Sequence, residues 1–380
     1  MYDLIMPRNI FSGENSIQSL KEVIIKEKIF RVLILTDSGI ASTDLPDLVL
    51  ENIPPDTDSV VMSNIVPEPS YEQVQKIIDD CRAYNPDFII ALGGGSVIDT
   101  AKLASLLIRS PLKVKNLLAD PLLLSKSIKM LAIPTTAGTG AEATPNAIVA
   151  VPEERMKVGI VNRTMIPDYV ILDPVVLSNI PKRVAASTGI DALCHAIECF
   201  TGNKANRFSD FFALESLSLI LNNIEKCLND HTDIVAREKM LLASFYAGVA
   251  ITSSGTTAVH ALSYPLGGRY HIAHGISNAI LLVPVMKFNE DAIRDRLAIV
   301  YDKCIFGGLS APEEKSQAVI ARLEEITDNA GIPKNLEDFG VVKDDIDDLV
   351  DSAMKVTRLL SNNAKPVGPA DAVSIYSEIL

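Results

Sequence analysis

The first half of the 380-residue chain alternates short apolar runs with amphipathic stretches. The clearest strand-like runs are RVLILTD at 31–37, FIIALGGG from Phe88 and IKMLAIPTT from Ile128. The segment YEQVQKIIDDCRAY from Tyr71 has helical spacing, and a second helix is expected from Ser96. Because such alternation is typical of βαβ units, this half predicts a parallel sheet covered by helices. Further strand-like segments lie at 146–151, 156–161 and 168–173.

The pattern changes after Pro174, and helical periodicity dominates from about Pro181 to the end. The segment MLLASFYAGVAITSS from Met240 is apolar all round, which on a helix indicates burial on every side. We therefore expect an α/β domain over residues 1–177 and an all-helical domain over residues 178–380. The buried helices of the second domain also favour a subunit interface, so a homodimer or larger homo-oligomer is expected.

Composition narrows the class of protein. Hydrophobic residues make up 48% of the chain and charged residues 22%, as in ordinary globular proteins. The net charge of 35 − 48 = −13 repels nucleic acid and anionic membranes, so neither is expected as a partner. Five cysteines without a CxxC pair suggest neither a disulfide framework nor a thiolate zinc site. The opening MYDLIMPRNI lacks the features of a signal peptide, and a cytoplasmic protein is expected.

The glycine-rich segment DFIIALGGGSVIDTAK leads from a strand into a helix. Gly93, Gly94 and Gly95 lack the Cβ atoms that would keep a ligand away from the backbone, so free N–H groups and the helix dipole could bind a pyrophosphate. Ser96 is expected to cap the helix and Asp99 to complement its dipole. The alternative is a tight turn without a ligand, because this is neither GxGxxG nor a Walker loop.

Two further segments bear on a dinucleotide site. Asp37 ends a predicted strand, where a carboxylate could bind an adenosine ribose and repel the 2′-phosphate of NADP, although an aspartate there is also a common helix cap. In IPTTAGTGAEAT, three threonines interleave with glycines just after a strand and could bind a ribose or nicotinamide. They are Thr135, Thr136 and Thr139. A polar loop without a ligand is the alternative.

The second half contains a candidate metal site. In GIDALCHAIECF, Asp191 and His195 stand four residues apart on an otherwise apolar helix, so they project from one face. A cation would satisfy both buried groups, but so would a direct Asp–His bond. His260 follows an apolar helix, and His274 lies fourteen residues further on, beyond a segment that Pro265 is expected to break.

An aspartate with three histidines offers oxygen and nitrogen ligands that suit Fe²⁺, Zn²⁺ or a related divalent ion. His271, three residues before His274, is a rival ligand, whereas His231 in LNDHTD is expected at the surface.

These motifs together resemble the iron-containing alcohol dehydrogenases, a family that includes lactaldehyde reductase, 1,3-propanediol dehydrogenase and butanol dehydrogenase. The resemblance runs from PRNIFSGENSI to the C-terminal NNAKPVGPADAVSIYSEIL. It implies a Rossmann-like parallel-sheet domain followed by an all-helical metal-binding domain, as in dehydroquinate synthase-like folds, with the active site in the cleft between them. The activity implied is hydride transfer between a nicotinamide and a small alcohol or aldehyde.

The resemblance also assigns residues. The cofactor loop falls on Gly93, Gly94, Gly95 and Ser96, followed by Asp99; the second cofactor segment falls on Thr135, Thr136 and Thr139, with Lys157 near the nicotinamide ribose. The metal ligands fall on Asp191, His195, His260 and His274. Asp37 matches the position associated with a preference for NAD over NADP.

One position departs from the family pattern. Many members have a histidine four residues after the position of His260, near the substrate, where this chain has Tyr264. Tyr264 and His271 are therefore candidates for steering protons or substrate. Two rival functions stay open: a zinc polyol dehydrogenase like glycerol dehydrogenase, and a catalytically idle NAD-binding assembly protein. The fourth metal donor and the PLGGRYHIAHGISNAILL segment favour the iron-type group.

Overall fold

The computed structural model describes residues 2–154 and 156–380 and separates into two compact units. The α/β unit comprises Ile5–Thr136 and Gly140–Ile180. The helical unit comprises Pro181–Leu380, the segment ending at Leu4, and the short insertion Ala137–Thr139. The main division, after Ile180, lies 180 − 177 = 3 residues beyond the expected boundary, because the turn that follows Pro174 stays with the α/β unit.

A six-stranded parallel sheet organises the α/β unit, as the sequence predicts. In spatial order its strands are β1 (Asn9–Ser12), β8 (Tyr169–Leu172), β5 (Lys129–Pro134), β4 (Phe88–Gly93), β2 (Arg31–Asp37) and β3 (Asp58–Ile65). The two strands that the pattern missed, β1 and β3, are the edges of the sheet. β1 has four residues and β3 is only partly buried, so neither shows the apolar run of a central strand.

The expected strands β6 (Asn146–Val151) and β7 (Met156–Val161) do not join this sheet but pair antiparallel as a separate ribbon. Residues along β6 alternate between buried and partly exposed, which is the pattern of a strand with one covered face. The buried face packs into the same apolar core as α5.

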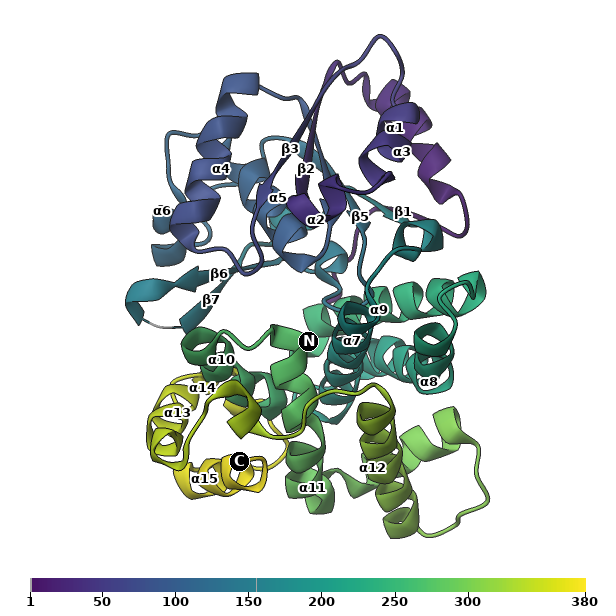
Figure 1. Ribbon diagram of the computed structural model, residues 1–380, viewed down its shortest axis with the longest axis vertical. Helices are drawn as coiled ribbons and strands as arrows, with labels where there is room; N and C mark the ends of the chain where they lie inside the picture. Colours follow the sequence, from purple (N-terminus) through teal and green to yellow (C-terminus); the bar gives the residue numbers. More distant parts are fainter. Residues whose placement is uncertain (1, 155) are drawn as a thin grey trace. The chain divides into compact units, whose positions relative to one another are not determined.

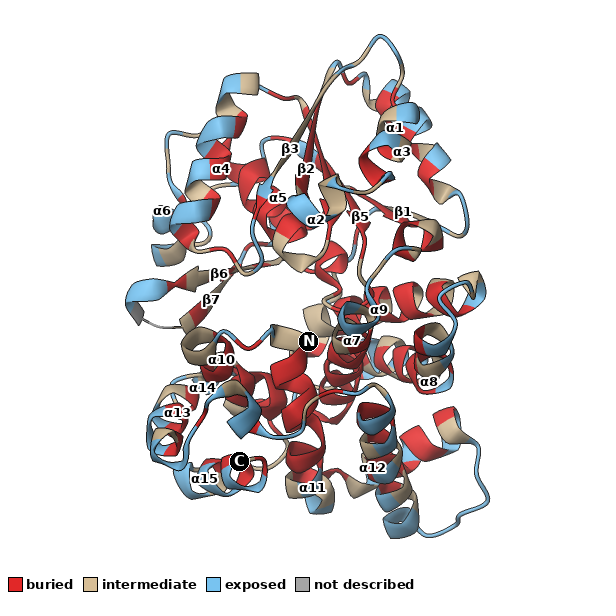
Figure 2. Ribbon diagram, in the orientation of Figure 1, coloured by how far each residue is buried: buried red, intermediate tan, exposed pale blue. Residues whose placement is uncertain are grey.

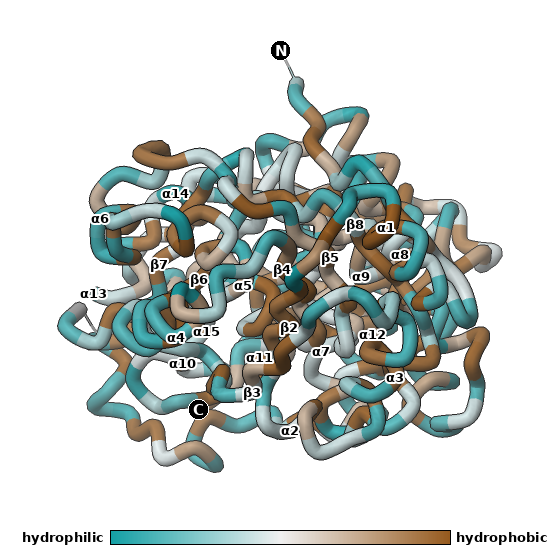
Figure 3. Tube along the Cα trace, turned by 90° about the horizontal axis from the view of Figure 1, so that it is seen from above, coloured by the Kyte–Doolittle hydropathy of each residue, from teal (hydrophilic) through white to brown (hydrophobic). Residues whose placement is uncertain are grey.

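Helices cover both faces of the main sheet (Figure 1). Helices α1 (Ser19–Glu27) and α3 (Leu45–Glu51) pack against Val32 and Ile34 on one face. Helices α4 (Tyr71–Tyr84) and α5 (Gly95–Leu107) pack against Leu33 and Leu35 on the other. The hydropathy colours of Figure 3 follow this arrangement, with apolar residues concentrated along β2 and β4. The unit also contains two short α-helices, α2 (Ser38–Ala41) and α6 (Val114–Ala119).

The second unit is helical, as expected. Its helices are α7 (Lys182–Thr201), α8 (Arg207–Asn229), α9 (Ile234–Ser254), α10 (Ala258–Tyr270), α11 (His274–Val300), α12 (Pro312–Asn329), α13 (Ile346–Ala353), α14 (Thr357–Leu360) and α15 (Pro369–Glu378). Much of α7, α9, α10 and α11 is buried (Figure 2). Among the described residues, no helix has both the length and the apolar character needed to cross a membrane.

The expected break at Pro265 is wrong. Helix α10 continues through Pro265 and both following glycines and ends at Tyr270. A proline inside a helix removes one backbone hydrogen bond, a cost that tertiary packing of this buried segment offsets. The chain reverses at His271, which adopts the left-handed conformation with φ 55° and forms the C-cap of α10.

Candidate active site

Part of the predicted cofactor site lies at the carboxyl ends of adjacent strands of the α/β unit. β2 and β4 are neighbours, yet the chain runs from β2 to β3 on one side and from β4 to β5 on the other. Such a reversal of strand order opens a crevice beyond the strand ends, where α/β proteins bind ligands. Asp37 ends β2, Gly93 ends β4, and Thr135 follows β5 at the same edge.

The glycine turn is built for close packing. A Cβ on Gly93 would lie 2.6 Å from a methyl carbon of Val97, so glycine lets α5 start directly after β4. The expectation that Ser96 caps this helix is wrong, because the N-cap is Gly94 and α5 begins at Gly95. Within the described chain no side chain caps the first turn of α5. Its amide groups are therefore suited to an anionic ligand.

Ser96 and Lys157 are both linked to Glu68. The hydroxyl of Ser96 accepts a hydrogen bond from the backbone N–H of Glu68 at 3.0 Å. The ammonium group of Lys157 forms an ion pair with the Glu68 carboxylate at 2.7 Å. Glu68 has a φ of 51°, an uncommon conformation for a residue with a side chain. The structure thus places two of the predicted cofactor residues around one strained backbone position.

Asp99 lies in α5, but its contacts are internal. One carboxylate oxygen accepts from Lys102 at 3.1 Å and the other from the backbone N–H of Ile148 at 2.9 Å. Lys102 is fully buried and also donates to Thr144 and to the carbonyl of Asn146. Burial raises the pKa of Asp99 and lowers that of Lys102, and their mutual attraction opposes both shifts. These contacts tie the β6–β7 ribbon to α5.

Asp37 acts as a helix cap in this structure, the alternative that the sequence left open. Its Oδ1 accepts hydrogen bonds from the N–H groups of Gly39 and Ile40 at 2.8 and 3.0 Å. It thereby forms the N-cap of α2. The carboxylate stays partly exposed at the end of β2, so capping leaves room for a second role toward a ligand.

The threonine segment divides between the two units. The N–H of Thr135 donates to the carbonyl of Gly93 at 3.2 Å, and Thr136 lies next to Gly94. Thr139 belongs to the insertion of the helical unit. Gly138, beside it, is buried against Thr188 of α7, where a Cβ would lie 2.6 Å from the Thr188 Cβ.

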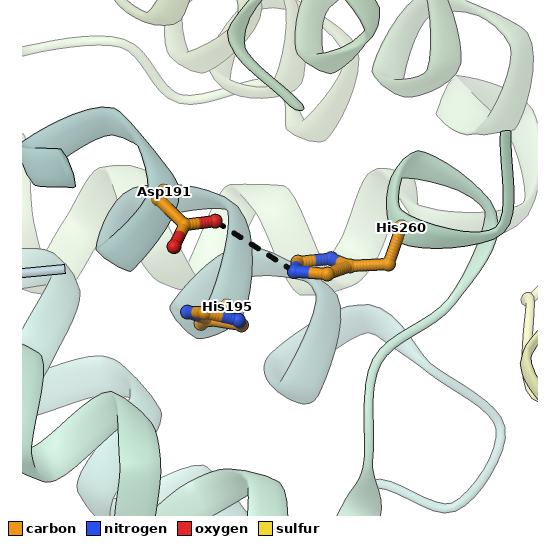
Figure 4. Close-up of side chains that lie close together, drawn as sticks. All are labelled: Asp191, His195 and His260. Carbon is orange, nitrogen blue, oxygen red and sulfur yellow. Dashed lines mark ion pairs between the residues drawn. The ribbon is translucent and has the colours of Figure 1, made fainter. Parts of the chain in front are cut away.

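A cluster of side chains that could hold a metal ion lies in the helical unit (Figure 4). The potential ligand atoms of Asp191, His195 and His260 all lie within 4.8 Å of one another, and all three residues are buried. The distance from Asp191 Oδ1 to His260 Nε2 is 3.8 Å. The two imidazole rings of His195 and His260 stack with centroids 4.5 Å apart. The alternative of a closed Asp191–His195 pair is thus inadequate, because a third donor from α10 joins them.

His274, the first residue of α11, adjoins this cluster. Its Nε2 also lies 3.8 Å from Asp191 Oδ1. The side-chain amide of Asn278, one turn further along α11, donates to Asp191 at 2.7 Å and lies 3.2 Å from Nε2 of both His260 and His274. Three polar side chains from α10 and α11 therefore surround the carboxylate of Asp191 on α7.

The rear nitrogens of two histidines are engaged by the protein. Nδ1 of His195 lies 3.3 Å from the carbonyl oxygen of Gly138, and Nδ1 of His260 is hydrogen-bonded to the carboxylate of Glu198. In each ring, a proton on Nδ1 leaves Nε2 with a free lone pair. Such bonds are usual behind metal-binding histidines.

Burial and mutual attraction set the protonation of the cluster. Burial alone would raise the pKa of Asp191, but the nearby histidines and Asn278 lower it. Burial lowers the pKa of His195, against the pull of Asp191. At neutral pH Asp191 thus offers an anionic carboxylate beside the unprotonated imidazole of His195, a donor pair that fits a divalent cation. Burial acts to lower the pKa of His260, but the Glu198 carboxylate outweighs it and raises this pKa.

The two residues predicted to steer protons lie in different surroundings. Tyr264 is half-buried on α10, and its ring centroid is 6.1 Å from that of His274. Burial raises the pKa of Tyr264, with Arg358 acting against the shift. His271 is exposed at the end of α10. Tyr264 therefore lies near the cluster, whereas His271 forms the C-cap of α10.

Sequence reasoning missed Glu198 and Asn278. Glu198 follows Asp191 by seven residues and His195 by three, which places it on the same side of α7. Asn278 follows His274 by four residues on α11. The helical spacing that identified Asp191 and His195 therefore contained the signal for both.

Comparison with known proteins supplies an independent line of evidence. A sequence model described as iron-containing alcohol dehydrogenase matches residues 7–174, and one described as the C-terminal part of the Fe-containing alcohol dehydrogenase family matches residues 185–380. The chain is 35% identical over 352 residues to long-chain-alcohol dehydrogenase 1 of Geobacillus thermodenitrificans, covering 91% of this chain and 88% of that protein. It is 32% identical to the NAD-dependent methanol dehydrogenase of Bacillus methanolicus, covering 87% and 88%. The crystal structure of a 1,3-propanediol oxidoreductase superposes with a TM-score of 0.94 at 27% identity, covering 100% of both chains.

Proposed function

The chain belongs to the iron-containing alcohol dehydrogenase family, and we propose that it interconverts a small primary alcohol and its aldehyde with NAD as the hydride carrier. That it is an alcohol dehydrogenase follows from the family and its relatives. The observation that carries the metal-dependent mechanism is the convergence of Asp191, His195 and His260 on one point.

We assign the metal to Asp191, His195, His260 and His274. Their oxygen and nitrogen donors suit Fe²⁺ or Zn²⁺, and we propose Fe²⁺ as the native ion because the family is the iron-containing one. The buried Asn278 Oδ1 has no hydrogen-bond partner within the described chain, which marks a polar centre that is incomplete without a further group. When bound, the metal would supply Lewis acidity toward the alcohol oxygen and the nicotinamide would supply the acceptor for the hydride, with one proton released.

The protein is proposed to hold the cofactor and the substrate in the orientation that the reaction needs. The amide groups at the start of α5, next to Gly94 and Gly95, are proposed to hold the pyrophosphate of the dinucleotide. Thr135, Thr136, Thr139 and Lys157 are proposed to bind its ribose and nicotinamide end, and Tyr264 to contact the substrate oxygen or limit the pocket. Ser96 and Asp99 act behind this surface by fixing the chain through their bonds to Glu68 and Ile148.

A preference for NAD over NADP is proposed from Asp37. Its carboxylate lies at the end of β2, beside the glycine turn in the order of the sheet. There it would face a 2′-phosphate as one negative charge against another. The relative from Bacillus methanolicus is named as NAD-dependent, which supports the same assignment.

The test is a screen of NADH and NADPH oxidation over small aldehydes, with metal-free protein reloaded separately with Fe²⁺ and Zn²⁺. We expect turnover with NADH and a short aldehyde only after metal is restored. Turnover confined to polyols with Zn²⁺ would instead favour a glycerol dehydrogenase-like enzyme. Absence of turnover on every substrate and metal would favour an idle NAD-binding protein.

The free cysteines and two exposed phenylalanines bear on the cellular compartment and on the oligomeric state. All five cysteines are free thiols, which fits the reducing cytoplasm. We propose a homo-oligomer, because Phe208 and Phe211 on α8 are 44% and 69% exposed and a second copy could cover them. Light scattering on the purified protein measures the mass directly, and a monomer at micromolar concentration would contradict the assembly.

A further inference from the structure

We infer that Glu198 is a positioning residue that prepares His260 to bind the metal. This inference rests on the proposed function, because it needs His260 to be a ligand. The carboxylate holds a proton on Nδ1 of the imidazole, so that Nε2, the nitrogen facing Asp191, keeps its lone pair for the ion.

The first support is the completeness of the contacts around Glu198, which has no exposed surface. Its Oε1 accepts from the N–H of Thr257 at 3.0 Å, from the Thr257 hydroxyl at 2.7 Å and from the N–H of Val259 at 2.8 Å. Its Oε2 is directed to Nδ1 of His260. A buried carboxylate with this many donors has a fixed orientation, and it fixes the imidazole in turn.

The second support is the direction of the His260 ring. With Nδ1 held from behind, Nε2 lies 3.8 Å from Asp191 Oδ1 and 3.2 Å from the amide nitrogen of Asn278. The nitrogen at the centre of the cluster is therefore Nε2, which lies beside Asp191 and the Asn278 amide rather than beside Glu198. No other arrangement of one proton on a neutral ring satisfies both the carboxylate and a cation.

The third support is the link between helices. Glu198 lies on α7, on the same helix as Asp191 and His195, whereas Thr257 and His260 lie at the start of α10. A single side chain thus anchors the amino end of α10 to the helix that carries the other two donors. The negative charge is also favourably placed at a helix N-terminus.

Helix capping alone would explain the bonds to Oε1, so the experiment must separate capping from ring positioning. Glu198→Gln is suited to this, because an amide oxygen can still accept from Thr257 and Val259. Its NH₂ group then faces Nδ1 and can only donate, which forces the His260 proton to Nε2 and blocks the ligand nitrogen. Thr257→Val is the matched control, since it removes one donor to Oε1 and leaves the Glu198–His260 contact in place.

Two measurements follow. Zn²⁺ affinity is determined by competition with a chromophoric chelator, and the tautomer of His260 is read in metal-free protein by ¹⁵N NMR at alkaline pH. We expect Glu198→Gln to weaken Zn²⁺ binding about 10–100-fold and to move the proton to Nε2. Thr257→Val should lower the melting temperature and leave Zn²⁺ affinity within a factor of about three.

Equal loss of Zn²⁺ affinity in both variants, or unchanged affinity in Glu198→Gln, would overturn the inference. If Glu198→Gln does not fold, the wild-type spectrum decides: a proton on Nε2 of His260 contradicts the positioning role. Failure of wild-type protein to bind any divalent ion would instead refute the proposed metal-dependent function. The two failures are therefore distinguishable without measuring alcohol turnover.

Discussion

His195 Nδ1 lies 3.3 Å from the carbonyl oxygen of Gly138, a residue whose own Cα packs directly against α7. A Cβ at position 138 would lie 2.8 Å from the carbonyl oxygen of Thr188. Backbone atoms at that distance cannot yield without moving α7 or the insertion. The absence of a side chain at Gly138 is therefore what allows its carbonyl to reach the histidine.

Gly138→Ala should consequently destabilise the protein by about 1–3 kcal/mol, the usual cost of forcing an extra carbon into a packed site. It should also weaken metal binding, because the carbonyl that orients His195 moves away. Chemical denaturation and Zn²⁺ titration measure the two effects. Gly308→Ala is the control, since a Cβ there meets no atom within 4 Å. Wild-type metal affinity in Gly138→Ala would show that the His195–Gly138 contact is dispensable.

Removal of His195 or His274 should abolish turnover and leave NADH binding intact. The reason is that both histidines lie in the helical unit, whereas the glycine turn lies in the α/β unit. NADH fluorescence titration of His195→Ala and His274→Ala measures the binding. The exposed His231→Ala serves as the control and should retain full activity. Loss of NADH binding with secondary structure retained would refute this division of labour.

The cofactor preference is best tested by Asp37→Asn. Asparagine keeps an oxygen to cap α2 through Gly39 and Ile40 and removes only the charge. We expect the NADH-to-NADPH ratio of kcat/KM to fall at least about fivefold, because one pair of like charges about 4 Å apart costs roughly 1 kcal/mol even in water.

Asp37→Gly would also reduce the preference for NADH over NADPH, but it would remove the N-cap of α2 as well. The loss of charge and the loss of the cap could then not be separated. Asp44→Asn is the control, because Asp44 is exposed and makes no side-chain capping bond to α3. An unchanged ratio in Asp37→Asn would place Asp37 outside the adenosine ribose site.

The sequence predicted the central strands well, because their apolar runs are long and buried on both faces. Strand β2 covers residues 31–37 and helix α4 covers 71–84, as expected. It could not reveal that β6 and β7 form their own ribbon, since alternation indicates one covered face but not which strand is the partner.

The candidate metal site shows a similar limit. Spacing within α7 identified Asp191 and His195. Glu198 follows on the same side of the helix, but its role was not predictable because its partner Thr257 lies 59 residues away on another element. The expected helix break at Pro265 was wrong for a different reason. A proline usually ends a helix, but α10 continues because the stabilisation from its packing outweighs the loss of one hydrogen bond. The periodicity of a sequence predicts one helix or strand at a time, whereas the role of Glu198 and the continuation of α10 depend on contacts between two elements.

Tyr264 lies one turn after His260, and its ring is tilted by 45° to that of His274 with centroids 6.1 Å apart. If its hydroxyl contacts a substrate oxygen during the reaction, Tyr264→Phe should lower kcat/KM for the best aldehyde about tenfold, equivalent to about 1.4 kcal/mol. An unchanged kcat/KM would leave Tyr264 only a packing role. The alternative is that the exposed His271 transfers the proton, and the pH dependence of kcat/KM in His271→Ala tests it. An unaltered pH dependence in both Tyr264→Phe and His271→Ala would indicate that solvent water accepts the proton.

Glu142 gives a pH dependence that is independent of the metal site. Its side chain is 1% exposed and its Oε1 has no partner within the described chain. Burial raises its pKa from 4.5 to about 7, with the charge of Lys102 acting to lower it and that of Asp99 to raise it. Since the folded state binds this proton more tightly than the unfolded state, the contribution to stability is complete below about pH 4.5 and disappears as pH rises through about 7.

Glu142→Gln removes this titration, so its unfolding free energy relative to wild type should increase between pH 4.5 and 7 and then stay constant. The total increase is at most about 3 kcal/mol, from a shift of 7 − 4.5 = 2.5 pKa units at 1.36 kcal/mol each. Denaturant unfolding of chelator-treated protein at several pH values measures the difference. Glu51→Gln, at an exposed position on α3, should give a flat difference over the same range. A flat profile for Glu142→Gln as well would mean that the Glu142 carboxylate has a counter-charge or bound water that keeps it ionised in the folded protein.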